Sequence, residues 1–288
     1  MTSSVRGMLV MLVMLVAVAM FALMDTGMKL LAAHYPATQV AALRGLASWP
    51  FVVVWVLLSG GPGQLLRVRW PLHLLRGVLA VVMLATFAYA LKRLPLAEAY
   101  ALFFVAPLLV SALAVPLLGE QVGWRRWCAI GVGLLGTVVI LRPSGQGLLS
   151  LSGLAVLASA LAYAIGAISV RVLGRSDTTQ AMVFWMLSLL ALFATILAWP
   201  EWRAVRGEDV WLLAGVGVSG AAGQYCVTEA FRRTPASLVA PLEYTALVWA
   251  LGLDWLLWRT FPDATTLLGA GIIVASGLYL IRGERRET

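Results

Sequence analysis

The chain contains the sequence Leu91-Lys92-Arg93-Leu94-Pro95-Leu96-Ala97, which begins a stretch that ends in Val139-Ile140-Leu141-Arg142. A second stretch near the C-terminus begins Phe231-Arg232-Arg233-Thr234-Pro235-Ala236-Ser237 and ends in Tyr279-Leu280-Ile281-Arg282. Identical residues recur between them at a constant offset of 140: Ala90, Arg93, Pro95, Leu102 and Ala106 match Ala230, Arg233, Pro235, Leu242 and Ala246. In a chain of 288 residues, this offset predicts two related halves.

The composition is that of a membrane protein. Hydrophobic residues make up 61% of the chain, charged residues make up only 12%, and the mean hydropathy is +0.92. Soluble domains contain about a quarter charged residues, so a chain with so few charges cannot cover a water-exposed surface. The net charge of +8 comes from positive residues scattered between apolar runs, which argues against a nucleic-acid-binding surface. Cys128 and Cys226 lie in apolar segments and indicate no redox compartment.

The apolar runs predict an all-α integral membrane fold with ten transmembrane helices, since a spanning helix needs about 20 apolar residues. The predicted ranges are 8–32, 39–58, 73–91, 96–118, 125–141, 151–172, 179–199, 210–230, 237–258 and 264–282. The first range has an alternative interpretation as a cleaved signal peptide, because Arg6 precedes it and Ala17-Val18-Ala19 resembles a cleavage site. Its apolar run continues past that point, and the repeat requires the segment, so we expect a retained helix.

The positive residues predict the orientation in the membrane. With the N-terminus in the cytoplasm, 13 of the 21 lysine and arginine residues fall on the cytoplasmic side. They are Arg6, Arg67, Arg69, Arg76, Arg125, Arg126, Arg171, Arg175, Arg232, Arg233, Arg282, Arg285 and Arg286. The positive-inside rule therefore predicts that both termini are cytoplasmic.

Each predicted half, residues 1–143 and residues 151–288, holds five helices. An odd number of crossings makes the two copies enter the membrane from opposite sides, so the halves are predicted to be inverted repeats. Inverted repeats are common among transporters, whose substrate site lies near the membrane midplane between the copies. Duplicated membrane proteins also serve as channels or scaffolds, and the repeat alone leaves these alternatives open.

Three motifs in or beside the predicted helices form a recognisable set. They are Asp25-Thr26-Gly27-Met28-Lys29 with Pro36, Gln39 and Arg44; Pro95-x-x-Glu98 with Pro107 and Leu118-Gly119-Glu120; and Ala240-Pro241-Leu242-Glu243-Tyr244. The set resembles the EamA-type transporters of the drug/metabolite transporter superfamily, and the resemblance covers essentially the whole chain. It implies ten helices arranged as two inverted five-helix repeats. The chain departs from internal symmetry at one point, because Gly119-Glu120 follows the fourth helix and Arg259-Thr260 follows the ninth.

The resemblance implies export of small metabolites across the bacterial inner membrane, with amino acids prominent among them. Within the family, the chain is similar to bacterial exporters of aromatic and other amino acids. We therefore expect broad-specificity amino-acid export by alternating access, from a monomer or a homodimer in the lipid bilayer. The alternative is export of drugs or other small metabolites. Nucleotide-sugar and sugar-phosphate carriers are disfavoured, because only Lys29 and Arg44 qualify as cations in the expected cavity.

Charged residues inside spanning helices mark transport pathways or buried pairs. Asp25 and Lys29 stand four residues apart on one helix face and can neutralise each other. Arg44 has two possible roles, pairing with Asp25 or binding a substrate carboxylate. Glu98 and Glu243 are candidates for binding a substrate ammonium group or carrying a proton, although Glu98 also suits a helix N-terminus.

Aromatic and small polar residues in the repeat-related helices form a second set of candidates. The predicted substrate-binding residues are Tyr89, Tyr100, Phe104, Tyr163, Gln224 and Tyr244. A mostly apolar pocket with few polar groups admits side chains of varied size. The competing interpretation is an interfacial aromatic belt, which suits the tryptophans better than it suits mid-helix residues. The two copies differ where Phe103 and Phe104 align with Glu243 and Tyr244, so we expect the substrate chemistry there.

The motifs of other function classes are absent from the sequence. It contains no G-x-x-x-x-G-K-[ST] loop, H-E-x-x-H pair, G-x-S-x-G elbow or Cys/His cluster. We therefore expect neither an enzyme, nor a bound cofactor or metal, nor ATP-driven transport.

Overall fold

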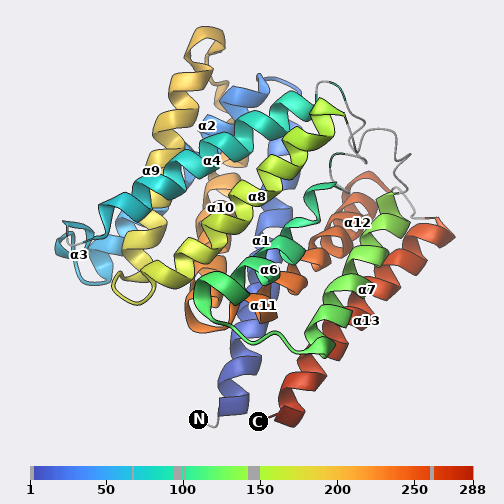
Figure 1. The fold of residues 1–288 in the computed structure, drawn as a ribbon. Coiled ribbons are helices and arrows are strands. Elements are labelled where there is room, and N and C mark those ends of the chain that lie inside the picture. The colour runs from blue at the N-terminus through green and yellow to red at the C-terminus, as the bar shows by residue number, and fades with distance from the viewer. Residues whose placement is uncertain are drawn as a thin grey trace.

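The structure is a computed structural model, and all its regular elements in the described residues are helices (Figure 1). It describes residues 3–66, 68–91, 93, 99, 102–141, 150–259 and 263–287. The α-helices are α1 (Ser3–Leu31), α2 (Ala37–Leu58), α3 (Gly63–Leu66), α4 (Trp70–Leu91), α6 (Ala106–Leu118), α7 (Trp124–Leu141), α8 (Leu151–Leu173), α9 (Thr179–Ala198), α10 (Val210–Arg233), α11 (Ala236–Val239), α12 (Thr245–Trp258) and α13 (Ala264–Glu287). The short 3-10 helices are η1 (Trp199–Glu201), η2 (Gly207–Asp209) and η3 (Ala240–Tyr244).

Eight helical segments in the described residues are long and apolar enough to cross a membrane. They confirm the predicted all-α membrane class. Two further apolar helices, Ala106–Leu118 and Ala264–Tyr279, are shorter. The predicted count of ten spans therefore goes beyond what the described residues establish. Large apolar side chains such as Leu135 and Leu154 stay exposed on the outside of the bundle, as contact with lipid requires.

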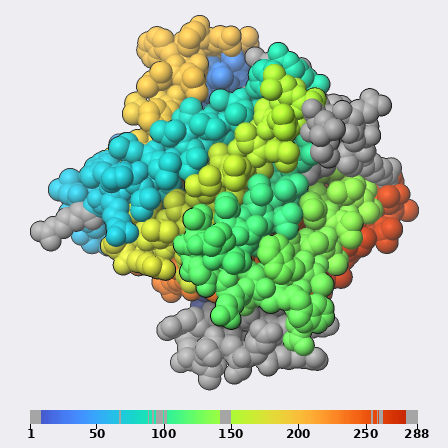
Figure 2. Space-filling model, viewed as in Figure 1, coloured from blue at the N-terminus to red at the C-terminus, as the bar shows by residue number. Residues whose placement is uncertain are grey.

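Helices from the two halves pack against each other in matched pairs. α1 packs on α10, and α4 packs on α8; likewise α1 contacts α12, and α6 contacts α8. α2 pairs with α9, and α7 pairs with α13. Exchanging the halves turns α1–α10 into α8–α4 and α1–α12 into α8–α6. It maps α2–α9 and α7–α13 onto themselves, as expected for two related copies around a twofold axis. Figure 2 shows α4, α8, α6 and α7 side by side across one face.

Polar side chains fasten the helix connections at both ends of the bundle. Both chain termini lie at one end, which we name the termini end (Figure 1). At the opposite end, the Tyr35 hydroxyl donates to Oδ2 of Asp209 at 2.6 Å. At the termini end, His73 Nε2 hydrogen-bonds Oδ2 of Asp177 at 2.8 Å. Burial would raise the pKa of Asp177, but hydrogen bonds from Ser176 and His73 hold it below its ordinary value.

Glycines bring α10 into close contact with α2 and α1. A Cβ on Gly217 would lie 2.3 Å from the carbonyl oxygen of Ala47 in α2. A Cβ on Gly223 would lie 2.9 Å from the ring of Phe21 in α1. A Cβ on Gly215 would meet nothing within 4 Å. Small residues let membrane helices approach closely, and only some of the α10 glycines serve this purpose.

We expect Gly217→Ala to lower the thermal unfolding midpoint, because the added methyl group meets the backbone of α2. Overpacking of this kind destabilises proteins by about 1–3 kcal/mol. Gly215→Ala is the matched control on the same helix, and alanine there should be neutral or stabilising by up to about 1 kcal/mol. The midpoints of both variants are measured in detergent. Equal midpoints would contradict the close approach of α10 and α2.

The predicted fourth and ninth helices, 96–118 and 237–258, are interrupted in the structure. In the first half, a turn at residues 104–105 precedes α6. In the second half, α11 passes into η3 and then into α12. Pro241 accounts for the second interruption, because proline has no N–H to donate within a helix. The prediction of two continuous helices was wrong at these points, and the breaks lie at the positions where the two copies differ.

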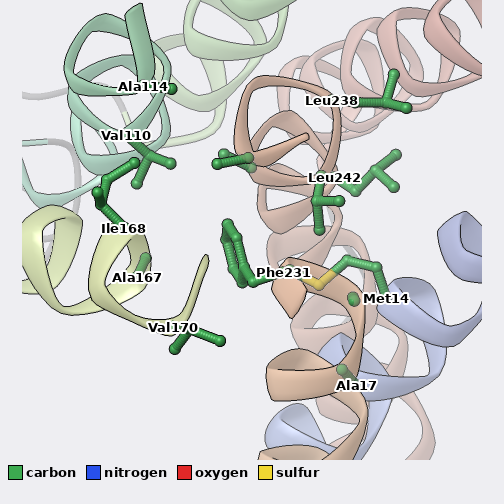
Figure 3. Packing of buried hydrophobic residues seen from close by; sticks show 14 of the residues in the cluster. Met14, Ala17, Val110, Ala114, Ala167, Ile168, Val170, Phe231, Leu238 and Leu242 are labelled. Carbon is green, nitrogen blue, oxygen red and sulfur yellow. The ribbon is translucent and has the colours of Figure 1, made fainter. Parts of the chain in front are cut away.

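An apolar cluster fills the centre of the bundle toward the termini end (Figure 3). Its members come from α1, α6, α7, α8, α9, α10, α11 and η3. We name it the apolar plug; the residues labelled in Figure 3 are Met14, Ala17, Val110, Ala114, Ala167, Ile168, Val170, Phe231, Leu238 and Leu242. Phe231 is 2% exposed and Leu242 is 0% exposed, so the plug is closely packed at these residues.

Candidate functional site

A hydrogen bond between Tyr163 and Glu243 lies at the centre of the candidate site. The Tyr163 hydroxyl of α8 donates to Oε1 of Glu243 in η3 at 2.7 Å. In the part of the chain that the structure describes, no lysine or arginine forms an ion pair with Glu243. The 3-10 geometry of η3 follows from the break at Pro241 and turns this carboxylate toward α8. Both residues were predicted site candidates, and the structure brings them into contact.

Aromatic rings surround this hydrogen bond. The centroid of the Phe103 ring lies 5.9 Å from that of Tyr163, and the centroid of the Phe104 ring lies 6.1 Å from that of Tyr244. Phe103 and Phe104 are the first-half counterparts of Glu243 and Tyr244. The divergent positions of the two copies therefore lie close together.

Tyr244 is held in place by a helix of the first half. Its ring lies over Gly133 of α7, where an added Cβ would come within 2.5 Å of the ring. The Tyr244 side chain is 1% exposed, and its hydroxyl has no hydrogen-bond partner within the described part of the chain. A buried hydroxyl without a partner is costly, and a movement of η3 or a bound polar group would satisfy it.

A second charged group joins α1 and α2. Asp25 in α1 and Arg44 in α2 interact electrostatically. The guanidinium carbon of Arg44 lies 5.8 Å from the centre of the Phe21 ring, within the range of a cation–π contact. Phe21 precedes Asp25 by four residues, so both lie on one helix face. The sequence identified Asp25 and Arg44 but missed Phe21, which this spacing could have indicated.

α1 exposes two different faces. Val16 and Leu23 belong to an exposed apolar face. Asp25 is also exposed. At about 100° per residue, Asp25 lies roughly 180° from Val16 and roughly 200° from Leu23 around the helix. A charged residue on the face turned away from the lipid indicates water-accessible space between the helices.

Open space also lies beside Tyr163 on α8. A Cβ on Gly166 would meet no atom within 4 Å, although Gly166 is only partly exposed. Gly166 follows Tyr163 by three residues, so the two share one face of the helix. The side chains of Tyr163 and Glu243 are likewise only partly buried. Solvent therefore reaches the centre of the candidate site.

The remaining predicted residues lie elsewhere or outside the description. Tyr89 stacks under Arg93, whose guanidinium carbon lies 4.2 Å from the ring centre, near the end of α4. Gln224 donates to Thr228 within α10 at 3.3 Å. Lys29 is exposed on α1. Glu98 and Tyr100 lie outside the described residues.

Glu229, another acidic residue of the second half, is already neutralised. It pairs with Arg233, accepts a hydrogen bond from the Thr179 hydroxyl at 2.5 Å, and lies 3.8 Å from Arg232. The contrast with Glu243 is informative, because no ion pair joins Glu243 to a lysine or arginine of the described residues. The same residues contain no group of three or more His, Cys, Asp or Glu that could hold a metal ion.

Known proteins resemble the chain over almost its full length. The sequence profile of the EamA-like transporter family matches residues 8–142 and again residues 151–282. The pseudopaline exporter CntI of Pseudomonas aeruginosa (strain UCBPP-PA14) is 29% identical over 266 residues, which cover 92% of this chain and 93% of that protein.

Two further relatives are named for other metabolites. The riboflavin transporter of Vibrio cholerae is 29% identical over 88% of this chain and 85% of its own length. The S-adenosylmethionine uptake transporter of Rickettsia prowazekii is 28% identical over 83% of this chain and 79% of its own length. A solved crystal structure has the same fold, with a TM-score of 0.83 over 97% of this chain and 99% of that chain at 20% identity.

Proposed function

Because this chain belongs to the EamA-like transporter family of the drug/metabolite transporter superfamily, we propose that it exports amino acids, aromatic and other apolar ones included, across the bacterial inner membrane. The chain is a membrane transporter whose relatives are named for metabolites. Amino-acid specificity and outward direction are the parts that we propose. In this proposal both termini are cytoplasmic, as the positive-inside rule favours, so the termini end faces the cytoplasm.

We propose further that residues 1–143 and 151–288 form inverted repeats with ten spans in total. Two observations support this organisation. The family profile matches the chain twice. Each helix contact described above has an equivalent contact, or is its own equivalent, when the two halves are interchanged. The shorter helices Ala106–Leu118 and Ala264–Tyr279 would complete five spans in each half.

The carboxylate of Glu243 is the observation that supports amino-acid transport most strongly. It lies at a helix break, hydrogen-bonded to Tyr163, and solvent reaches it. A substrate ammonium group supplies the positive partner that the described protein residues do not provide. Phe103, Phe104 and Tyr244 then form an apolar wall for the substrate side chain.

Asp25 and Arg44 form a second polar site, at a different depth in the membrane from Glu243. Met14 packs beside Leu242 in the apolar plug, next in sequence to Glu243 (Figure 3). Asp25 lies 11 residues beyond Met14 along α1, which corresponds to about 16 Å of helix. A single amino-acid head group cannot span that distance. Arg44 therefore meets the substrate carboxylate on the way out, while Glu243 binds the ammonium group centrally.

A second candidate function is the export of cationic drugs or other positively charged metabolites. Glu243 with its aromatic wall would bind such a cation as well as an ammonium group. Arg44 favours the amino-acid proposal, because a half-buried guanidinium within the membrane repels a cation and attracts a carboxylate.

Purified protein in liposomes tests the proposed function. Counterflow is measured with a panel of labelled amino acids, with and without a pH gradient, and with a labelled lipophilic cation. Riboflavin and S-adenosylmethionine are added as competitors, because the relatives are named for them. We expect aromatic and branched amino acids to move. Movement of the cation without movement of any amino acid would overturn the proposal in favour of the second candidate.

A further inference from the structure

Glu120 binds the opposite half of the protein at the termini end. The residue follows α6, yet its Oε1 accepts the N–H of Ala236 at 2.8 Å. Its Oε2 accepts the N–H of Ser237 at 3.1 Å and the Ser237 hydroxyl at 2.8 Å. Ala236 and Ser237 begin α11, which leads into η3 with Glu243 and Tyr244. One carboxylate thus holds the first turn of the segment that carries the candidate site.

Arg171 joins a third helix to this carboxylate. Its Nε lies 3.9 Å from Oε1 of Glu120. Its guanidinium also donates to the carbonyl oxygen of Arg232 at 2.7 Å. Arg171 lies near the end of α8, the helix that carries Tyr163. Glu120 therefore connects the ends of α6, α8, α10 and α11 in one polar cluster.

The apolar plug lies directly above this polar cluster. Leu238 follows Ser237 by one residue and is 1% exposed. Phe231 and Leu238 both belong to the plug and flank the α10–α11 connection (Figure 3). Holding the start of α11 therefore holds part of the plug. The polar cluster and the plug thus form two packed layers next to the segment that carries Glu243.

The two copies match in backbone but differ in this carboxylate. Gly119 ends α6 with φ 69°, and Arg259 ends α12 with φ 53°, so both helices end in the left-handed conformation. The residue after Gly119 is Glu120, and the residue after Arg259 is Thr260. A threonine side chain carries no charge and offers a single oxygen, whereas a carboxylate offers two charged acceptor oxygens. The carboxylate latch is thus specific to the first copy.

We propose that Glu120 is a latch that keeps the transport path shut at the termini end and positions η3 with Glu243. The role of the latch in a transport cycle rests on the proposed function, whereas the contacts of Glu120 do not depend on it. Loading substrate from the cytoplasm requires the Glu120 bonds to α11 to break, and export requires them to form again. Because the other copy lacks the acid, the two sides of the protein open with different ease, and the resting state is closed toward the cytoplasm.

Cysteine labelling tests the latch without any substrate. The reporter is Gly166→Cys in a Cys128→Ser, Cys226→Ser background, because Gly166 borders open space just above the plug. Membrane vesicles of both orientations, identified by protease access to a C-terminal tag, receive a membrane-impermeant thiol reagent. In Glu120→Ala, we expect labelling from the termini side to rise about tenfold or more, because bonds to a charged group are lost. Labelling from the opposite side should fall.

Two further variants make the outcome decisive. Glu208→Gln is the matched control, since Glu208 is an exposed acid beyond the network and should leave both labelling rates unchanged. Ser237→Ala removes only one bond to Glu120 and should raise termini-side labelling about threefold, which decides the case if Glu120→Ala does not fold.

A general loosening of structure would raise labelling from both sides. Unchanged or two-sided labelling would overturn the latch. A changed ratio of labelling from the two sides, together with an absence of amino-acid transport, would instead overturn the proposed function and still support the latch.

Discussion

Glu243→Gln is expected to lower amino-acid counterflow by about tenfold to a hundredfold while the protein still folds. Glutamine keeps the size of the side chain and can still accept a hydrogen bond from Tyr163. It cannot supply the negative charge that the substrate ammonium group needs. A hydrogen bond to a charged group contributes about 1.5–3 kcal/mol, which corresponds to this range of rates or affinities. Initial rates in liposomes, normalised to folded protein, measure the effect.

Two variants at Tyr163 define how the effect arises. Tyr163→Phe removes the hydroxyl that donates to Glu243 and should cost about fivefold, since one neutral donor contributes about 1 kcal/mol. Tyr163→Ala also removes a ring from the wall around Phe103 and should cost more. Wild-type transport by both Glu243→Gln and Tyr163→Ala would show that these residues only pack the bundle.

Arg44→Gln is expected to slow export of amino acids about tenfold and to leave, or even raise, transport of cations. The guanidinium is the positive charge that the structure describes beside Asp25 and Phe21, within the membrane. Its loss removes an attraction for the substrate carboxylate and a repulsion for cations. The measurement compares counterflow of phenylalanine with that of phenethylamine, which lacks the carboxylate.

The control for Arg44 is Arg206→Gln, an exposed arginine near the end of the bundle that lies opposite the termini end. It should leave both substrates unaffected. Arg44→Gln also leaves Asp25 without its cation, so the double variant Asp25→Asn, Arg44→Gln tests whether stability rather than recognition is lost. Equal losses for phenylalanine and phenethylamine in Arg44→Gln, recovered in the double variant, would contradict a role in substrate recognition.

The main features of the fold follow from patterns that can be recognised in the sequence. Apolar runs of helix length predict the all-α membrane class, because the hydrocarbon core sets the length of each helix. The repeat around Pro95 and Pro235 predicted two related halves, and the family profile, which matches the chain twice, supports a two-repeat fold. The role of individual glycines was not predictable. Gly215 and Gly217 look alike in sequence, yet only Gly217 contacts a backbone, because helix rotation decides which face meets α2.

The candidate site was predictable in part for similar reasons. Divergence between the copies indicated Glu243 and Tyr244, and the structure adds Tyr163 as the direct partner of Glu243. The interruption at η3 was missed, since Pro241 alone suits a mild kink as well as a change to 3-10 geometry. The contacts of Glu120 with Ala236 and Ser237 were missed because these residues lie more than 100 positions away in sequence. The sequence marked Glu120 only as an acid that the second copy lacks.

The measurement that tests the account most directly is competition in counterflow of labelled phenylalanine. The competitors are unlabelled phenylalanine, phenethylamine without the carboxylate, and 3-phenylpropanoate without the ammonium group. A path in which Glu243 binds the ammonium group centrally should be inhibited by phenylalanine and by phenethylamine, which both carry that group. 3-Phenylpropanoate should be at least about tenfold weaker, because it lacks the charged interaction with Glu243. Phenylalanine that is not transported, or 3-phenylpropanoate that competes as well as phenylalanine, would contradict the account.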